Sequence, residues 1–227
     1  MKSMMFILLA VICLAVPSLY AGEKTDSTEF KLCFEAEANG KIAERNKKIK
    51  CTVNSMGKVQ GKDGVILFPG QVGDYIQVYK CPVLNFKKSF VLETEFQIEK
   101  FSDNSKKRVM MILKAQAYYI SFDSRSIEFG LYGVKYEGGS RFQFDAPLEM
   151  GKWYKLKFVY NGLEAKLFVN DKLVGKREAS GIIKTSPHYL YIGGFRGNSV
   201  YNKAFAGKMK YLKLGEIYPT GKSLTEN

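Results

Sequence analysis

Apolar and polar residues alternate along many short segments of this chain, which is the pattern of β-strands buried on one face. Residues 90–99, 153–160 and 164–169 each carry an apolar side chain at nearly every second position. These segments are rich in aromatic and β-branched residues, which suit a pleated, half-buried surface. The pattern therefore predicts antiparallel strands with one face in a core and one in water.

Turn-forming residues separate these segments at short intervals. Asn161-Gly162 is a strong signal for a two-residue hairpin between residues 153–160 and 164–169, and Asn170-Asp171 turns the chain again. About a dozen such segments without a convincing amphipathic helix predict an all-β, two-sheet antiparallel sandwich. Residues 37–64 are polar and basic with little periodicity, and we interpret them as an extended loop across the sandwich edge.

The first residues indicate export. Lys2 precedes an uncharged apolar run over residues 4–16, and Ala21 is a small residue suited to cleavage, so residues 1–21 have the layout of a secretory signal peptide. An uncleaved anchor is the alternative, although the run is short for a bilayer span. We expect a secreted, periplasmic or cell-surface protein whose mature chain has no transmembrane segment.

The mature chain suits a single domain. A hydrophobic content of 46% and an aromatic content of 14% are ample for one core, and no repeat or low-complexity segment is visible. We expect residues 22–63 to give an N-terminal strand and an irregular basic segment of the sandwich. Residues 64–218 would form its core, and residues 219–227 a frayed tail.

Cysteine usage fits an exported protein. The mature chain keeps Cys33, Cys51 and Cys81, so one thiol is left over. We prefer a disulfide between Cys51 and Cys81, with Cys33–Cys51 as the alternative. The single histidine and the absence of a Cys-x-x-Cys motif argue against a zinc site.

The formal charge of +13 favours anionic partners such as acidic glycans, cell-wall polymers or lipid surfaces. The lysines are nevertheless spread along the chain, which is typical of a solubilising surface and unlike a nucleic-acid-binding arm. Export argues independently against nucleic acid as a partner. Lys155, Lys157 and Lys166 form an outward row that suits either an acidic polymer or plain solvation, with further lysines nearby, namely Lys152, Lys172 and Lys176.

Several motifs follow one another in the C-terminal half. Gly151-Lys-Trp153-Tyr154 opens a strand, residues 165–174 form a hairpin, residues 190–194 end in Ile-Gly-Gly, and residues 205–214 form a last strand whose uneven apolar spacing suggests a bulge. In this order they resemble the laminin G-like jelly-roll domains of the concanavalin A-like lectin/glucanase superfamily, with Asp171 where that family usually has glycine.

The resemblance covers roughly residues 60–215, since residues 64–70, 74–78 and 89–96 resemble the first strands of that family. It implies one concave and one convex antiparallel sheet around an aromatic core. It does not select a function, because this fold occurs in lectins, hydrolases, lyases and adhesion modules.

Catalysis by a glycan hydrolase requires two carboxyl groups beside the scissile bond. The resemblance points to Glu93-Thr-Glu95, where family members that cleave β-glucans carry Glu-x-Asp-x-Glu, but Gln97 stands in place of the last acid. We expect His188 to be a surface loop residue and not a catalytic base. No catalytic residue is therefore assigned, and a divergent hydrolase using Glu93 and Glu95 is kept as an alternative.

Sugar binding requires exposed aromatic rings beside hydrogen-bonding groups. Alternation along residues 118–144 leaves four such side chains outside the core, and we select them as candidate ligand-binding residues: Tyr132, Tyr136, Arg141 and Gln143.

The resemblance also implies a possible structural calcium ion, because such domains often hold calcium at a loop edge through oxygen ligands. Four residues at loops or strand ends are weak candidates for its ligands: Asp74, Asp123, Asp145 and Asn161. No Asp-x-Asp-x-Asp spacing supports them, and turn capping is the alternative.

These observations favour an exported, non-catalytic binding module for carbohydrate, with an acidic glycan among the candidates, or for cell-surface adhesion. Its partner would be a glycan or another extracellular polymer. A structural subunit of a surface assembly is the other alternative, besides the hydrolase.

Overall fold

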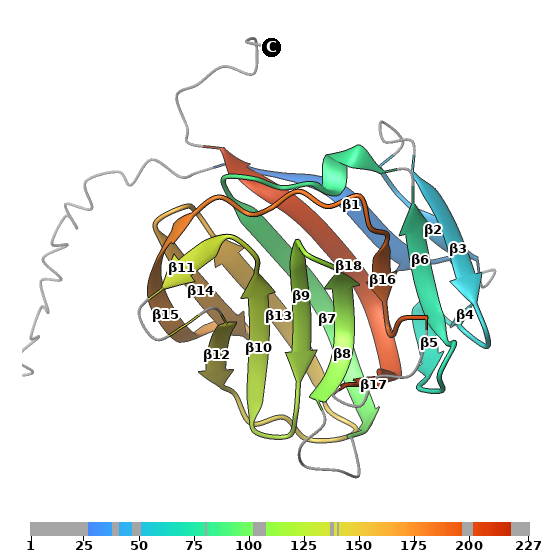
Figure 1. Ribbon diagram of the computed structural model, residues 1–227. Coiled ribbons are helices and arrows are strands. Elements are labelled where there is room, and N and C mark those ends of the chain that lie inside the picture. The colour runs from blue at the N-terminus through green and yellow to red at the C-terminus, as the bar shows by residue number, and fades with distance from the viewer. Residues whose placement is uncertain are drawn as a thin grey trace, which may run out of the picture.

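The computed structural model describes residues 27–218, apart from residues 38–40, 47–50, 80, 102–107, 137–138, 140 and 197–201. This part of the chain forms two sheets stacked face to face (Figure 1), which confirms the predicted jelly-roll sandwich. The predicted signal peptide and residues 219–227 lie outside the described residues. Within the described residues, no helix is both long enough and apolar enough to span a bilayer.

The rear layer in Figure 1, which we call sheet A, has its main strands in the order β11-β15-β14-β13-β7-β18-β1-β2, with β5 and β4 added beside β18. Its strands are β1 (Ser27–Ala36), β2 (Ile42–Glu44), β4 (Gln60–Lys62), β5 (Val65–Pro69), β7 (Phe90–Lys100), β11 (Val134–Tyr136), β13 (Trp153–Tyr160), β14 (Glu164–Val169), β15 (Lys172–Gly181) and β18 (Ala206–Tyr218).

The front layer, sheet B, has the order β12-β10-β9-β8-β16-β6-β3, with β17 beside β8. Its strands are β3 (Thr52–Met56), β6 (Tyr75–Tyr79), β8 (Arg108–Lys114), β9 (Tyr118–Phe122), β10 (Ser126–Leu131), β12 (Arg141–Asp145), β16 (Leu190–Ile192) and β17 (Asn202–Ala204). A single turn of 3-10 helix, η1 (Pro82–Leu84), follows β6.

The core lies between the two layers and is largely aromatic. Leu156, Phe158 and Leu167 of sheet A and Ile192 of sheet B are each at most 1% exposed. The rings of Phe158 and Phe129 stack across the two sheets with centroids 3.9 Å apart. Burying each large apolar side chain contributes about 1.5–3 kcal/mol, so the alternation seen in the sequence is what holds the layers together.

The two predicted turns differ in length. Asn170 and Asp171 have φ angles of 51° and 62°, and they connect the paired residues Val169 and Lys172, so the two-residue hairpin lies here. The Asn161-Gly162 connection is longer. Residues 161–163 connect β13 and β14, and the Asn161 side-chain oxygen accepts hydrogen bonds from the N–H groups of Leu163 and Glu164, 3.0 and 2.9 Å away.

The expectation of one irregular loop over residues 37–64 is wrong. The described part of this segment contains β2, β3 and β4, which pair with β1, β6 and β5. Most of their side chains are partly or fully exposed, because each strand lies at a sheet edge with little core to cover. A strand that contacts the core only slightly needs no alternation, so the hydrophobic pattern gave no signal.

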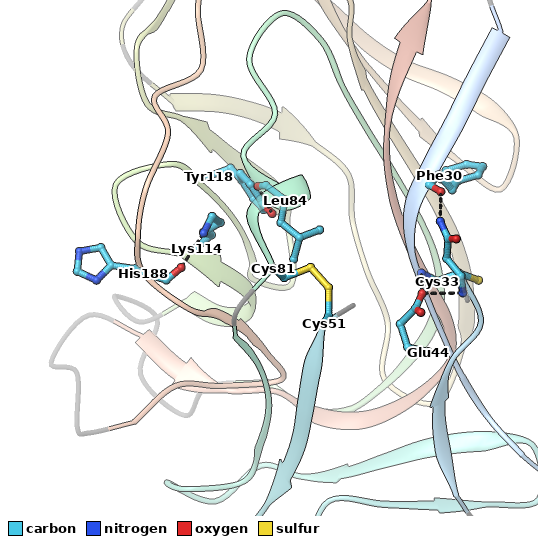
Figure 2. The surroundings of a disulfide bond; sticks show 10 residues. Phe30, Cys33, Glu44, Cys51, Cys81, Leu84, Lys114, Tyr118 and His188 are labelled. Atoms are coloured by element: carbon cyan, nitrogen blue, oxygen red, sulfur yellow. Dashed lines mark hydrogen bonds between the residues drawn. A yellow bond between two sulfur atoms is a disulfide. The ribbon is translucent and has the colours of Figure 1, made fainter. Parts of the chain in front are cut away.

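The preferred disulfide is present. Cys51, just before β3, is bonded to Cys81, just before η1, with a Cα–Cα distance of 4.8 Å (Figure 2). It closes a separation of 30 residues and fastens the edge strand β3 to the sandwich, which on the chain-entropy model contributes ~3–4 kcal/mol. Cys33 on β1 is half-buried and free.

The bulge expected in the last strand is also present. The pairing of β18 with β7 shifts register between Met209 and Tyr211, so that Met209, Leu212 and Leu214 all reach the core despite their uneven spacing.

Candidate functional site

A buried polar network lies on the outer face of sheet B. The Arg108 side chain, on β8, donates hydrogen bonds to the side chains of Asp123 (2.5 Å) and Ser121 (3.1 Å). It also donates to the backbone oxygen of Ser126 (2.9 Å) and lies 4.0 Å from a Glu128 carboxylate oxygen. These bonds tie β8, β9 and β10 together on the side away from the core.

The Asp123 carboxylate is held in its ionised form. Its burial acts to raise the pKa, but the N–H groups of Arg125 and Ser126 and the charge of Arg108 outweigh burial and lower the pKa of Asp123 below its usual value. Asp123 therefore acts as an anchor for the loop between β9 and β10.

Tyr119 lies over Gly130 and is joined to this network through Glu128. Gly130 on the neighbouring strand β10 has no side chain, and a β-carbon there would overlap the Tyr119 ring. The Tyr119 hydroxyl donates a 2.6 Å hydrogen bond to the buried carboxylate of Glu128. Burial, followed by this bond, raises the pKa of Tyr119, so the hydroxyl stays protonated and the ring is fixed.

Three of the four selected ligand residues surround Tyr119. Tyr132 is 45% exposed, and its ring meets that of Tyr119 edge to face at 6.4 Å. Arg141 on β12 is paired with Gly130, and its charge acts on the Tyr119 hydroxyl. Gln143 is exposed on the same strand and donates to the Ser126 hydroxyl (3.3 Å). We call Tyr119, Tyr132, Arg141 and Gln143 the tyrosine platform.

Tyr136 has a different place. Its ring stacks on the buried Phe142 at 4.4 Å, and its hydroxyl accepts a hydrogen bond from the Arg141 backbone N–H at 2.9 Å. Tyr136 therefore supports the strand that carries Arg141 and Gln143.

The outer face of sheet A is a lattice of ion pairs. Glu93 contacts Lys157 at 2.9 Å, and Glu95 contacts Lys210. Each glutamate is therefore engaged with a lysine of a neighbouring strand of sheet A.

The lysine row on sheet A is likewise paired. Lys155 contacts Asp171 at 2.7 Å, and Glu164 lies between Lys176, at 2.6 Å, and Lys166. Hydrogen bonds from these two lysines lower the pKa of Glu164. Since the acids lie among the lysines, this face presents little net positive charge to a polymeric anion.

Three of the four calcium candidates use their side-chain oxygen atoms to accept backbone N–H groups of turns. Asp74 accepts hydrogen bonds from the N–H groups of Lys58 (2.8 Å) and Gln71 (3.1 Å), and Asn161 and Asp123 accept backbone N–H groups as described above. Asp145 is exposed at the end of β12. Among the described residues, no three acidic, histidine or cysteine side chains form a group that could hold a metal ion. A structural calcium ion stays a prediction.

Sequence reasoning passed over Tyr119 and the network beneath it. The signal was present, because Tyr118 and Ile120 point into the core and alternation therefore directs Tyr119 outward. The role of Gly130 was not readable, since it depends on which residue of the adjacent strand lies opposite.

The two stacked antiparallel sheets and their strand order are those of a concanavalin A-like jelly-roll domain. A laminin G family model of the concanavalin A-like lectin/glucanases superfamily matches residues 69–215, and the chain belongs to this family. No relative was found among curated proteins by sequence.

Solved structures share the fold at low sequence identity. The binding domain of Paraclostridial Mosquitocidal Protein 1 is similar with a TM-score of 0.61 and 15% identity, covering 86% of this chain and 49% of that one. The binding domain of botulinum neurotoxin serotype D gives 0.59 and 14%, covering 86% and 49%. The chain thus spans about half the length of these toxin domains.

A third similar structure is domain 4 of AbnA, an extracellular GH43 arabinanase from Geobacillus stearothermophilus, solved in complex with arabinotriose. It has a TM-score of 0.56 and 12% identity, and the match covers 85% of this chain and 95% of that domain.

Proposed function

We propose that this chain is an exported, non-catalytic carbohydrate-binding module that holds its ligand against the tyrosine platform on the outer face of sheet B. The observation that carries the proposal is the fixed ring of Tyr119, laid over Gly130 beside the exposed ring of Tyr132. The apolar face of a sugar stacks on such rings, and neighbouring polar groups orient its hydroxyls.

Preorganisation supports this assignment. The bond from the Tyr119 hydroxyl to Glu128 and the bonds of Arg108 fix the surface before a ligand arrives. Binding to a rigid surface avoids the entropy cost of ordering its side chains, and this favours affinity. Arg141 and Gln143 extend from the adjacent strand and offer donors and an acceptor to sugar hydroxyls.

The comparisons and the disulfide agree with the proposal. A structural neighbour of nearly the same length, domain 4 of AbnA, was solved with arabinotriose, and another neighbour is described by an interaction of botulinum neurotoxin type C with two ganglioside molecules. A disulfide between Cys51 and Cys81 is typical of an oxidising compartment outside the cytosol.

The test is a glycan array with the purified chain, run with calcium or with a chelator and at two salt concentrations. We expect binding that persists at high salt, because stacking and neutral hydrogen bonds are screened little. Tyr132→Ala should abolish it, whereas Leu173→Ala, which removes an exposed apolar side chain on sheet A, should leave it unchanged. Absence of binding to every glycan, or equal binding by both variants, would contradict the proposal.

A further inference from the structure

A small pocket lies elsewhere on sheet B, where β6 and β16 meet the loop before β16. Its volume is about 190 Å³, and six of its lining residues carry the argument: Tyr79, Asn85, Lys114, Ser186, His188 and Tyr189. Ligand pockets for drug-sized molecules measure about 300–1,000 Å³, so this one suits a single sugar residue.

Lys114, at the end of β8, brings a positive charge into this pocket. The residue is only 4% exposed, and its ammonium group donates to the backbone oxygens of Ser186 (2.9 Å) and His188 (2.6 Å). In Figure 2 the Lys114 side chain points towards the His188 backbone, while the imidazole ring points away. An ammonium group has three N–H donors, so these two carbonyls leave one donor for another acceptor.

The Lys114 charge has no acidic counter-ion among the residues that the structure describes. In the described part of the chain, no acidic side chain lies within ion-pair distance of Lys114, and burial lowers the pKa of its amine without an opposing acidic neighbour. Burying an unpaired charge is costly, and an anion placed beside it would offset that cost. Lys114 differs in this from the lysines of the sheet A ion pairs, each of which contacts an acid: Lys155, Lys157, Lys166, Lys176 and Lys210.

Two tyrosines line the same pocket as Lys114. Tyr189 is 47% exposed and meets Tyr79 edge to face with ring centroids 5.8 Å apart. A pocket lined by both an ammonium group and tyrosine residues offers the two components that an acidic sugar requires, namely a partner for its carboxylate and a surface for its ring.

We propose that this pocket is a subsite for a carboxylate-bearing sugar residue, with Lys114 binding the carboxylate and Tyr79 and Tyr189 contacting the ring. The subsite deepens the proposed function, on which it rests for the chemical class of the ligand. It places the recognition of acidic glycans at one buried lysine and not in the lysine row of sheet A.

The experiment is an NMR titration of the isotope-labelled chain with methyl β-D-glucuronide and with methyl β-D-glucoside. The two ligands differ only at C6, which carries a carboxylate in the first and a hydroxymethyl group in the second. We expect the glucuronide to bind about tenfold more tightly, as one charge-assisted hydrogen bond implies. Its chemical-shift changes should centre on Tyr79 and residues 186–190. Equal affinities, or changes centred elsewhere, would overturn the proposal without any substitution.

Variants then separate binding from structure. Lys114→Met should remove the preference for the glucuronide, and Tyr189→Ala should weaken both ligands alike. Lys172→Met, an exposed lysine on sheet A, is the charge-matched control and should change neither. If Lys114→Met folds and keeps the preference, Lys114 only fastens the loop before β16, and the proposal is wrong. Should that variant not fold, the wild-type titration and Tyr189→Ala decide.

The two proposals can fail separately. Neutral glycans that require Tyr132 but show no preference for a carboxylate would overturn the subsite and leave the tyrosine platform intact. Glucuronide binding that requires Lys114 and is unchanged by Tyr132→Ala would overturn the tyrosine platform and leave the subsite intact.

Discussion

The outer faces of the two sheets use charge in opposite ways. On sheet A, acids and lysines meet pairwise at the surface, as Glu93 and Lys157 do. On sheet B, one arginine, Arg108, contacts several acceptors at once, and both it and its partner Glu128, which accepts the bond from Tyr119, are largely shielded from water. The lattice of sheet A neutralises its own charges, whereas the network of sheet B fixes side chains that remain open to a ligand.

This difference explains why net charge is a poor guide to the ligand here. Several of the chain's lysines lie in ion pairs with the acids of sheet A, which cancel their charges, so the formal charge of +13 does not point to this face. Exposed pairs of this kind contribute about 0–1 kcal/mol each and mainly keep the surface soluble. Binding specificity is expected where a charge is buried or a ring is fixed, and both of these features occur on sheet B.

The comparison is tested most strongly by removing one cation from each face. Arg108→Met leaves the Asp123 and Glu128 carboxylates without their shared partner, and we expect a loss of about 3 kcal/mol in the free energy of unfolding. Lys157→Met should cost below about 1 kcal/mol. Urea unfolding followed by the fluorescence of Trp153 measures both. Equal losses would mean that the two faces do not differ.

A substitution at Gly130 tests the fixed ring. Gly130→Ala forces the Tyr119 ring off β10, which should cost about 1–3 kcal/mol through overpacking and remove glycan binding. The double variant with Tyr119→Ala should regain most of the stability but not the binding, because the clash is relieved and the ring is gone. If the double variant is no more stable than Gly130→Ala, the glycine has another role.

Much of the fold could be predicted from local pattern alone. Alternation places Leu156 and Phe158 in the core, and the turn residues Asn170 and Asp171 have the positive φ angles that their hairpin requires. These features depend on neighbours along the chain. The short edge strand β2 was missed because its three residues are all only half-buried.

The site was predictable only in part, because it is made between strands. Tyr132, Arg141 and Gln143 could be selected by alternation, but the position of Tyr119 over Gly130 depends on the register of β9 against β10. Lys114 comes two residues after the buried Ile112, so the alternation of a strand already directs its side chain to the same, apolar side of β8. A lysine in an apolar register is the signal that could have marked the second pocket.

Acid titration gives a smaller contrast between the faces. The pKa values of Asp123 and Glu164 are both lower in the folded chain than in the unfolded chain, where they are about 4. Each ionised carboxylate therefore stabilises the fold at a pH above the unfolded-state pKa. This stabilisation is lost as the pH falls through the folded-state pKa. Denaturation between about pH 4 and 2 should therefore be less steep for Asp123→Asn and for Glu164→Gln than for wild type. Added salt should shrink only the Glu164 effect, since its lysines are exposed.

The smallest effect is expected at the two acids that a hydrolase would use. Glu93→Gln and Glu95→Gln should leave glycan binding unchanged, because each removes one surface ion pair on the face opposite the tyrosine platform. Glu128→Gln is the informative partner, since it weakens the acceptor of the Tyr119 hydroxyl and should lower binding. Product analysis of any glycan bound on the array completes the test. If new reducing ends appear with the wild-type chain and are absent with Glu93→Gln, the chain is a hydrolase that acts at sheet A. A binding surface on sheet B cannot produce that result, because cleavage of the glycan requires a catalytic carboxyl group.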